Sequence, residues 1–283
     1  MFYTGFADEA GTALTDQIRA HKALGWNHIE VRMLPEGNFT EVEDAVFDKA
    51  LAELNSAGIK ISCFGSPIAN WARHIDKDFE ADIASLKRAI PRMKKAGCSL
   101  IRIMSWPNSE KKPLADEDWK KEVLRRLKVL AKMAEAGGVT LGLENCSGWS
   151  GEKPENMVAT IETVKSAALK IIYDTGNVVG HGGKAFDWWA KCKPYTVYIH
   201  IKDGKHTRGA EAQYAFPGEG EGMVREVLKD LFASGYDGGI SIEPHLAAQV
   251  HLGTTAEGKK NAFDLYVEYG RRLMALADEA RRK

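Results

Sequence analysis

The feature that most constrains the fold is a regular alternation of two kinds of segment along all 283 residues. Short runs rich in aliphatic and β-branched residues recur eight times, and segments with helical spacing of apolar residues separate them. The eight runs, which we expect to be strands, are residues 2–7, 28–32, 60–65, 100–106, 140–146, 169–176, 196–203 and 238–245. Strands that alternate with helices pair in parallel through right-handed crossovers. The pattern predicts an α/β fold, a single (β/α)8 TIM barrel over residues 1–283.

The predicted helices carry the expected apolar face and end signals. Within residues 118–138, apolar side chains recur at helical spacing, at Val123, Leu127, Leu130 and Ala134. Three helices are followed by a glycine that suits the left-handed position at a helix C-terminus, at Gly58, Gly97 and Gly235.

Composition excludes several classes of function. The formal net charge is +0, from 39 basic and 39 acidic residues, so we expect no nucleic-acid or membrane partner. The N-terminal residues lack the features of a signal peptide, and no apolar run approaches the ~20 residues of a membrane span. The four cysteines are scattered without a CxxC pair, which suits a reducing compartment. We therefore expect a cytoplasmic protein.

Two connecting segments are longer than a minimal β/α unit needs. Residues 65–78 follow the third predicted strand and residues 203–222 follow the seventh, and both are rich in glycine, proline and polar residues. In a TIM barrel the C-terminal ends of the strands carry the active site, and long loops there can close over a substrate. We expect the active site at this end of the barrel.

Four polar residues stand at or near the ends of the last four predicted strands: Glu144, Asp174, His200 and Glu243. Neighbouring strands of a closed barrel bring their ends together, so these side chains can converge. A single acid at a strand end is more often a helix cap, but four in register favour a site for one divalent metal ion. Mn²⁺, Co²⁺ and Mg²⁺ suit three carboxylates and an imidazole, with Zn²⁺ as a further alternative.

At these residues the chain resembles the xylose-isomerase-like TIM-barrel family of sugar isomerases and epimerases, in particular the ketose 3-epimerases. The resemblance is carried by the motifs LEN, DTGN, HIKD, GEGEG and IEPH. It implies one divalent ion, Mn²⁺ as the first choice, held by Glu144, Asp174, His200 and Glu243. It also implies that Glu144 and Glu243 are the catalytic acid and base on opposite faces of a sugar. Asn177 stands where the free-ketose 3-epimerases have a histidine, and the DTGN form is more similar to the sugar-phosphate branch. The resemblance therefore implies either a free sugar or a sugar phosphate as the substrate.

The expected function is a metal-dependent isomerase or epimerase that stabilises a cis-enediolate. A dehydratase of a keto-sugar or keto-inositol would use the same ion and base, and stays open. An endonuclease IV-like phosphodiesterase would need additional histidines at the early strand ends, which SCFGSP and IRIMSW lack. A non-catalytic sugar-binding module would leave the two flanking carboxylates unexplained.

Further polar residues near these motifs are candidate substrate-binding residues: Asn177, His181, Lys202, Arg208, Glu219 and His245. Lys202 shares a strand face with His200, so it can hold a substrate oxygen or phosphate, or pair with an acid. The other candidates lie in polar or glycine-rich loops, where a solvated side chain is the ordinary alternative. Barrels of this resemblance often form dimers or tetramers, so a homo-oligomer is compatible with the sequence.

Overall fold

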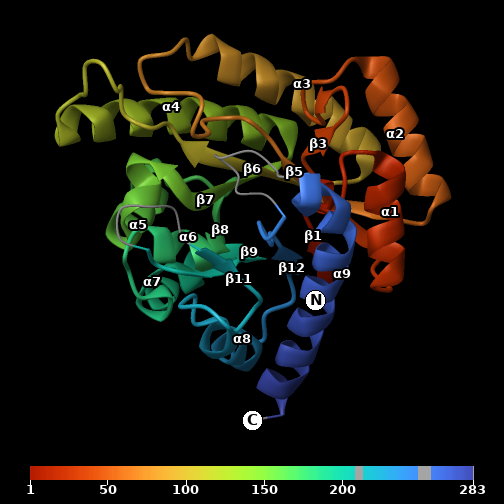
Figure 1. Cartoon of the computed structure of the whole chain (residues 1–283). Helices are drawn as coiled ribbons and strands as arrows, with labels where there is room; N and C mark the ends of the chain where they lie inside the picture. Colours follow the sequence, from red (N-terminus) through yellow and green to blue (C-terminus); the bar gives the residue numbers. More distant parts are fainter. Residues whose placement is uncertain (208–212, 248–255, 283) are drawn as a thin grey trace.

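The computed structural model describes residues 1–207, 213–247 and 256–282, with side chains from residue 261 onward in the last range. Eight parallel strands form a nearly closed barrel with helices around it (Figure 1). The order of the strands is β1-β12-β9-β8-β7-β6-β5-β2, and a parallel bridge between Phe6 and Glu30 joins the two ends of the sheet. The predicted (β/α)8 TIM barrel is confirmed.

All eight predicted strands are present, most of them shorter at one end than the sequence pattern indicates. Their bounds are β1 Phe2–Gly5, β2 His28–Val31, β5 Lys60–Gly65, β6 Leu100–Ser105, β7 Thr140–Gly148, β8 Leu169–Asp174, β9 Thr196–Ile201 and β12 Gly239–Ile242. The predicted run 169–176 ends early because the carboxylate of Asp174 accepts backbone N–H groups and starts a helix there.

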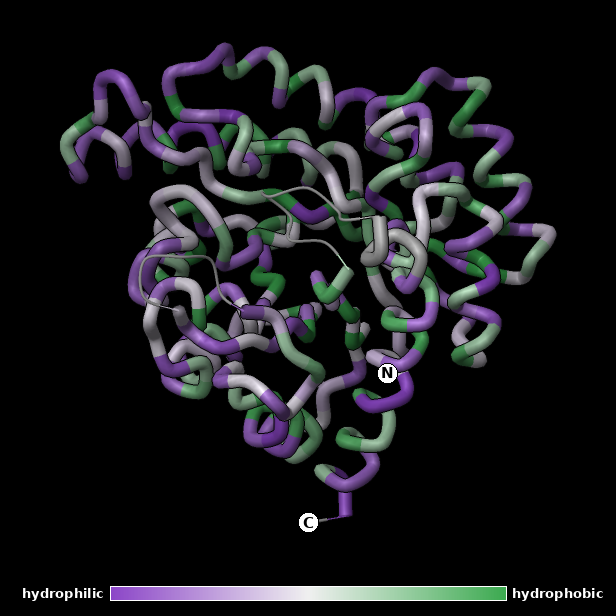
Figure 2. The backbone as a smooth tube through the Cα atoms, viewed as in Figure 1, coloured by the Kyte–Doolittle hydropathy of each residue, from purple (hydrophilic) through white to green (hydrophobic). Residues whose placement is uncertain are grey.

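Helices surround the barrel, and all but the short helix at the C-terminal end of β8 cover its outside. They are α1 Leu14–Ala23, α2 Asp44–Ser56, α3 Glu80–Ala96, α4 Asp116–Gly137, α5 Pro154–Val164, α6 Thr175–Gly180, α7 Ala185–Cys192, α8 Val224–Ala233 and α9 Ala256–Arg281. Hydrophobic and hydrophilic residues alternate along these outer helices, as expected for amphipathic helices on a barrel (Figure 2). The predicted inward face of α4 is confirmed, since Val123, Leu127, Leu130 and Ala134 are fully buried.

The predicted glycine signals are also confirmed. Gly58, Gly97 and Gly235 have φ of 71°, 66° and 73°, a region that glycine adopts without the steric cost of a Cβ atom. Among the described residues, no helix combines the length and hydrophobicity needed to cross a bilayer.

Short hairpins lie beyond the C-terminal ends of two barrel strands. Strands β3 Met33–Leu34 and β4 Gly37–Asn38 pair after β2. Within the long seventh connection, β10 Asp203–Lys205 pairs antiparallel with β11 Gln213–Ala215. These hairpins enlarge the end of the barrel at which the sequence predicts the active site.

Candidate metal centre and active site

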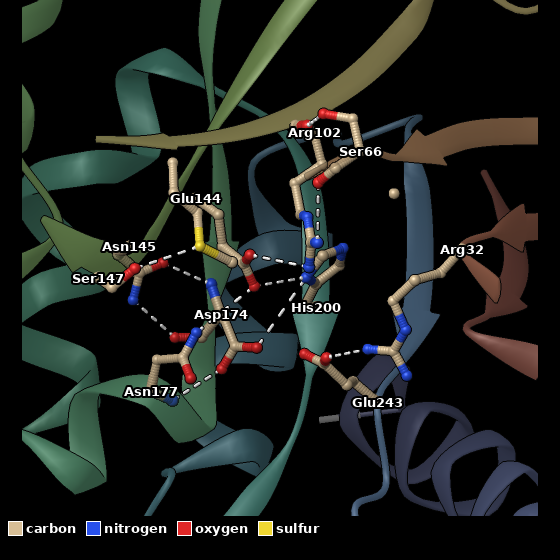
Figure 3. Close-up of polar contacts among 12 residues, drawn as sticks. Arg32, Ser66, Arg102, Glu144, Asn145, Ser147, Asp174, Asn177, His200 and Glu243 are labelled. Carbon is tan, nitrogen blue, oxygen red and sulfur yellow. Dashed lines mark hydrogen bonds and ion pairs between the residues drawn. The ribbon is translucent and has the colours of Figure 1, made fainter. Parts of the chain in front are cut away.

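The structure brings the four predicted metal ligands together (Figure 3). Glu144 lies on β7, Asp174 ends β8, His200 lies on β9, and Glu243 directly follows β12. One ligand atom from each lies within 4.8 Å of those from the other three. All four side chains are buried, so their charges interact in a medium that screens them weakly.

The motifs LEN and DTGN fix the position of Asp174. The side-chain oxygen of Asn145 accepts the backbone N–H of Asp174 at 2.6 Å, and its amide donates to the carbonyl of Asp174 at 2.9 Å. Oδ1 of Asp174 accepts the N–H groups of Gly176 and Asn177, each at 2.8 Å, which caps α6. The other oxygen, Oδ2, is left to face the cluster.

His200 is held between two carboxylates. Its Nδ1 lies 3.0 Å from Oε1 of Glu144, and its Nε2 lies 3.1 Å from Oε2 of Glu30. Burial by itself lowers the pKa of His200, but the charges of Glu30 and Glu144 outweigh it and raise the pKa to about 10. The hydroxyl of Ser241 donates to Glu30 at 2.6 Å, which fixes the carboxylate behind the ring.

Lys202 and Arg32 neutralise Glu243. Nζ of Lys202 lies 2.9 Å from Oε2 of Glu243, and a guanidinium nitrogen of Arg32 lies 2.8 Å from Oε1. Burial raises the pKa of Glu243, but Lys202, His245 and Arg32 together bring it well below its usual value. Lys202 also lies 3.1 Å from Oδ2 of Asp174, whose pKa burial raises to about 6 against this attraction.

Arg102 neutralises the charge of Glu144. Its guanidinium lies 3.3 Å from Oε2 of Glu144 and donates to the carbonyl of Ser66. Burial raises the pKa of Glu144, while Arg102 and His200 lower it below its usual value. Glu144 and Glu243 are therefore both carboxylates near neutral pH.

The cluster fits a divalent ion. Oε2 of Glu144 and Oδ2 of Asp174 are buried and accept no hydrogen bond of good geometry. Their closest described polar contacts are the ion pairs with Arg102 and Lys202, so each retains lone pairs for a ligand. Three carboxylates and one imidazole form a donor set for a hard-to-borderline ion. A bound ion would replace the proton on Nδ1 of His200. With Nε2–H donated to Glu30, Nδ1 would then face the ion, because a carboxylate commonly orients a ligating imidazole in this way.

Three charged residues of the site were missed from the sequence: Glu30, Arg32 and Arg102. They interrupt the apolar runs HIEVR and LIRIMSW. A charged side chain inside a barrel strand that is buried on both faces needs a partner of opposite charge. The charged residues within these apolar runs were therefore the signal in the sequence that could have indicated the site. Arg32 also contacts Asp8 at 2.9 Å and Glu9 at 3.1 Å.

Three of the predicted substrate-binding residues line the pocket above the cluster: Asn177, Lys202 and His245. The amide of Asn177 lies 3.4 Å from Oε1 of Glu144. Nδ1 of His245 lies 2.8 Å from Glu9, and its Nε2 lies 3.6 Å from Oε1 of Glu243. His245 adopts φ of 53°, so this geometry imposes a backbone conformation that non-glycine residues rarely take.

The other predicted substrate-binding residues are placed differently. His181 stacks on Trp188 at 5.9 Å, and its Nε2 lies 3.3 Å from the carbonyl oxygen of Cys146. Glu219 is exposed and forms an ion pair of 2.6 Å with Arg272 on α9. Neither side chain belongs to the described pocket lining. Arg208 lies outside the described residues.

The motif GEGEG has a structural explanation. Buried Asp203 accepts four backbone N–H groups at 2.8–3.1 Å, those of Gly204, Gly218, Gly220 and Gly222. A Cβ atom on Gly220 would overlap Oδ1 of Asp203. The carboxylate thus fastens the seventh connection to the end of β9, directly beside the cluster.

The pocket has a volume of about 890 Å³. Polar groups of the cluster form one part of its wall, and Met33, Trp71 and Phe263 add apolar surface. Trp71 is 53% exposed, whereas Trp106 is buried and donates to Asp82 at 2.7 Å. A pocket of this size holds a small polar molecule.

This combination of a TIM barrel with a strand-end cluster of acids and one histidine defines a class of barrel proteins. The chain belongs to the xylose isomerase-like TIM barrel family, which it matches over residues 18–264. An uncharacterized protein of Methanocaldococcus jannaschii is 30% identical over 122 residues, and this match spans 41% of each chain.

Three solved structures share the fold. IolI protein, solved with a bound zinc atom, has a TM-score of 0.77 at 15% identity and 99% coverage of both chains. D-psicose 3-epimerase with D-tagatose, from Clostridium cellulolyticum H10, has a TM-score of 0.73 at 17% identity and 99% coverage of both. The probable 3-DHS dehydratase AsbF of Bacillus anthracis has a TM-score of 0.74 at 14% identity, covering 97% of this chain and 99% of its own.

Proposed function

We propose that this protein is a divalent-metal-dependent isomerase or epimerase of a ketose or ketose phosphate. The observation that carries the proposal is the approach of Glu144, Asp174, His200 and Glu243 to within 4.8 Å beside a pocket of sugar-accommodating size. The proposal is supported by a structural neighbour of this chain that processes sugars, D-psicose 3-epimerase, and by the family to which the chain belongs.

Those four residues would hold one ion, with Mn²⁺ as our first choice and Co²⁺, Mg²⁺ and Zn²⁺ as alternatives. When bound, the ion supplies a positive charge that stabilises the negative charge developing on adjacent oxygens of an enediolate. The carboxylate of Glu30, which the hydroxyl of Ser241 fixes in place, holds the His200 ring in the orientation that leaves Nδ1 toward the cluster.

Glu144 and Glu243 are our candidates for proton transfer. Strands β8 and β9 separate β7 from β12 in the barrel, so the two carboxylates enter the site from different directions. Arg102 holds Glu144 ionised, and Arg32 and Lys202 hold Glu243 ionised, so either carboxylate can accept a proton. One takes the proton from the carbon beside the carbonyl. The other takes up a proton from solvent and delivers it to the opposite face, which inverts that carbon, and the first carboxyl group then releases its proton to solvent.

Side chains of the pocket wall would hold the substrate. Asn177, Lys202 and His245 offer hydrogen bonds to hydroxyl, carbonyl or phosphate oxygens, and Trp71 offers a flat apolar surface to a carbon chain. The four cysteines are unpaired, and we propose a cytoplasmic enzyme, where thiols stay reduced.

The test is incubation of Mn²⁺-loaded protein with free and phosphorylated ketoses in deuterium oxide, followed by proton NMR. We expect a new sugar that carries deuterium at the inverted or isomerised carbon. Glu144→Gln and Glu243→Gln should each lower kcat by at least ~100-fold. Glu219→Gln is the matched control, because this exposed glutamate pairs with Arg272 away from the pocket.

Metal content is measured beside activity, since both catalytic candidates are also candidate ligands. Product formed at full rate without deuterium would contradict proton transfer through two exchanging carboxylates. A product one water lighter would reassign the protein to the dehydratase class, which uses the same ion and base. Unchanged sugar across the whole panel would contradict the proposal.

A further inference from the structure

Lys202 places its ammonium group among the candidate metal ligands. Its Nζ lies 3.1 Å from Oδ2 of Asp174 and 2.9 Å from Oε2 of Glu243. The side chain is only 5% exposed. These two residues come from the strands that flank β9, the strand that Lys202 directly follows. The ammonium therefore bridges two ligands that are far apart in the sequence.

The path of the Lys202 side chain is constrained along its length. Thr175 fixes the backbone, because its hydroxyl donates to the carbonyl of Lys202 at 2.6 Å and lies 3.3 Å from its N–H group. A Cβ atom on Gly176 would come within 2.6 Å of Cγ and 2.8 Å of Cβ of Lys202. Glycine in the DTGN motif thus leaves room for this side chain to pass into the cluster.

A metal ion and this ammonium compete for the same oxygens. Divalent ions bind carboxylate oxygens at about 2.0–2.2 Å, closer than any ammonium. Oδ2 of Asp174 is the oxygen left free by the helix cap, and Oε2 of Glu243 is the one that Arg32 does not contact. An ion held by these oxygens would repel the ammonium beside it strongly, because the site is buried.

The pocket offers space for the displaced ammonium group of Lys202. Lys202 lines the pocket of about 890 Å³, together with Asn177 and Tyr214. Rotation about its terminal bonds carries Nζ from the ligand oxygens toward this space, while the constrained stem stays in place. There it would meet the oxygens of a bound substrate.

We infer that Lys202 is an internal counter-cation of the metal site, which neutralises Asp174 and Glu243 until a divalent ion takes its place and releases it toward the substrate. The inference rests on the proposed metal-dependent function and adds an exchange of cations to it. It makes Lys202 a determinant of metal affinity, although its side chain cannot be a ligand while it carries a proton.

The test is isothermal titration of metal-stripped protein with MnCl₂ at one fixed pH. Lys202→Gln removes the competing charge and should lower the Kd for Mn²⁺ at least ~10-fold. Lys205→Gln, a matched change at an exposed lysine of β10, should leave the Kd unchanged. Lys202→Arg keeps the charge and should not bind Mn²⁺ more tightly than the unaltered protein.

Thermal unfolding supplies a second measurement that needs neither substrate nor turnover. In chelator, Lys202→Gln should melt below the unaltered protein, because Asp174 and Glu243 lose their counter-charge. Saturating Mn²⁺ should raise its Tm by more than it raises that of the unaltered protein. A Lys202→Gln protein that folds only with Mn²⁺ would give the same support.

The outcomes separate the two proposals. If the unaltered protein binds Mn²⁺ and Lys202→Gln binds it equally or more weakly, the inference is overturned and the metal-dependent function stands. Tighter binding by Lys202→Arg would also overturn the inference. If neither the unaltered protein nor Lys202→Gln binds Mn²⁺, Co²⁺, Mg²⁺ or Zn²⁺, both proposals are overturned together.

Discussion

Nε2 of His200 lies 3.1 Å from Oε2 of Glu30, and both side chains are fully buried. They come from β9 and β2, which other strands separate in the barrel sheet. The pair therefore spans the barrel interior. It fixes the ring so that Nδ1 points to Glu144, at 3.0 Å.

This pair predicts that Glu30 controls metal affinity without being a ligand. Glu30→Gln keeps a hydrogen-bond acceptor behind the ring but removes the charge that makes the imidazole a stronger donor to an ion. We expect a ~10–100-fold weaker Kd for Mn²⁺ in a calorimetric titration. Glu36→Gln, at an exposed position, is the control. Equal affinities of the Glu30 and Glu36 variants would contradict this role.

The ligand set itself predicts metal content. Gently purified protein should hold about one divalent ion per chain, measured by elemental analysis. His200→Ala should lose most of that ion while retaining its circular dichroism spectrum, because the barrel core is built by the strands and the surrounding helices. His206→Ala removes an exposed histidine and should keep the ion. Full occupancy in His200→Ala would rule out the ligand set.

The four backbone N–H groups that donate to Asp203 predict different effects on stability for two glycine substitutions. Gly220→Ala places a methyl group against Oδ1 of Asp203, so it should destabilise the protein by about 1–3 kcal/mol. Gly180→Ala meets no atom within 4 Å and lies in α6, so it should be neutral or stabilise by less than about 1 kcal/mol. Urea unfolding of the two variants measures the difference in the free energy of unfolding. Equal stabilities would show that the loop around Asp203 tolerates a side chain at position 220.

Buried His21 predicts a pH dependence of stability. Its Nδ1 lies 2.6 Å from the carbonyl oxygen of His28, its Nε2 lies 3.0 Å from the hydroxyl of Tyr266, and burial lowers its pKa to about 4. In the unfolded chain the pKa is about 6.5, so between these values the unfolded state binds more protons. The contribution of neutral His21 is complete above about pH 6.5 and is lost as the pH falls toward 4.

The expected size of this loss follows from a change in the free energy of unfolding of about 1.4 kcal/mol per pH unit for one titrating group. Urea unfolding of the unaltered protein and of His21→Gln should show a stability gap that narrows by about 2 kcal/mol between about pH 7 and pH 5. Other titrating groups affect both proteins alike, so the gap isolates His21. A gap that stays constant over this range would mean that the pKa of His21 is not lowered by folding.

Much of the site could be predicted because its chemistry coincides with strand ends. Glu144, Asp174, His200 and Glu243 each interrupt an apolar run, and closure of the barrel then brings them together without further information. Glu30, Arg32 and Arg102 could not be paired with these residues from the sequence. Their partners lie 23 to 211 positions away, and which charges meet depends on the strand register.

The amino-acid sequence by itself determined the alternation of strands and helices, the glycines at Gly58, Gly97 and Gly235, and the residue types at the strand ends. These features are local, because they depend on side-chain spacing and on backbone φ. Only the tertiary structure decided that Lys202 points into the cluster, that Glu219 turns outward to Arg272, and that four N–H groups of a glycine-rich loop converge on Asp203. The physical reason is that a charged group takes the position in which its desolvation is offset by partners, and those partners are set by packing across the barrel.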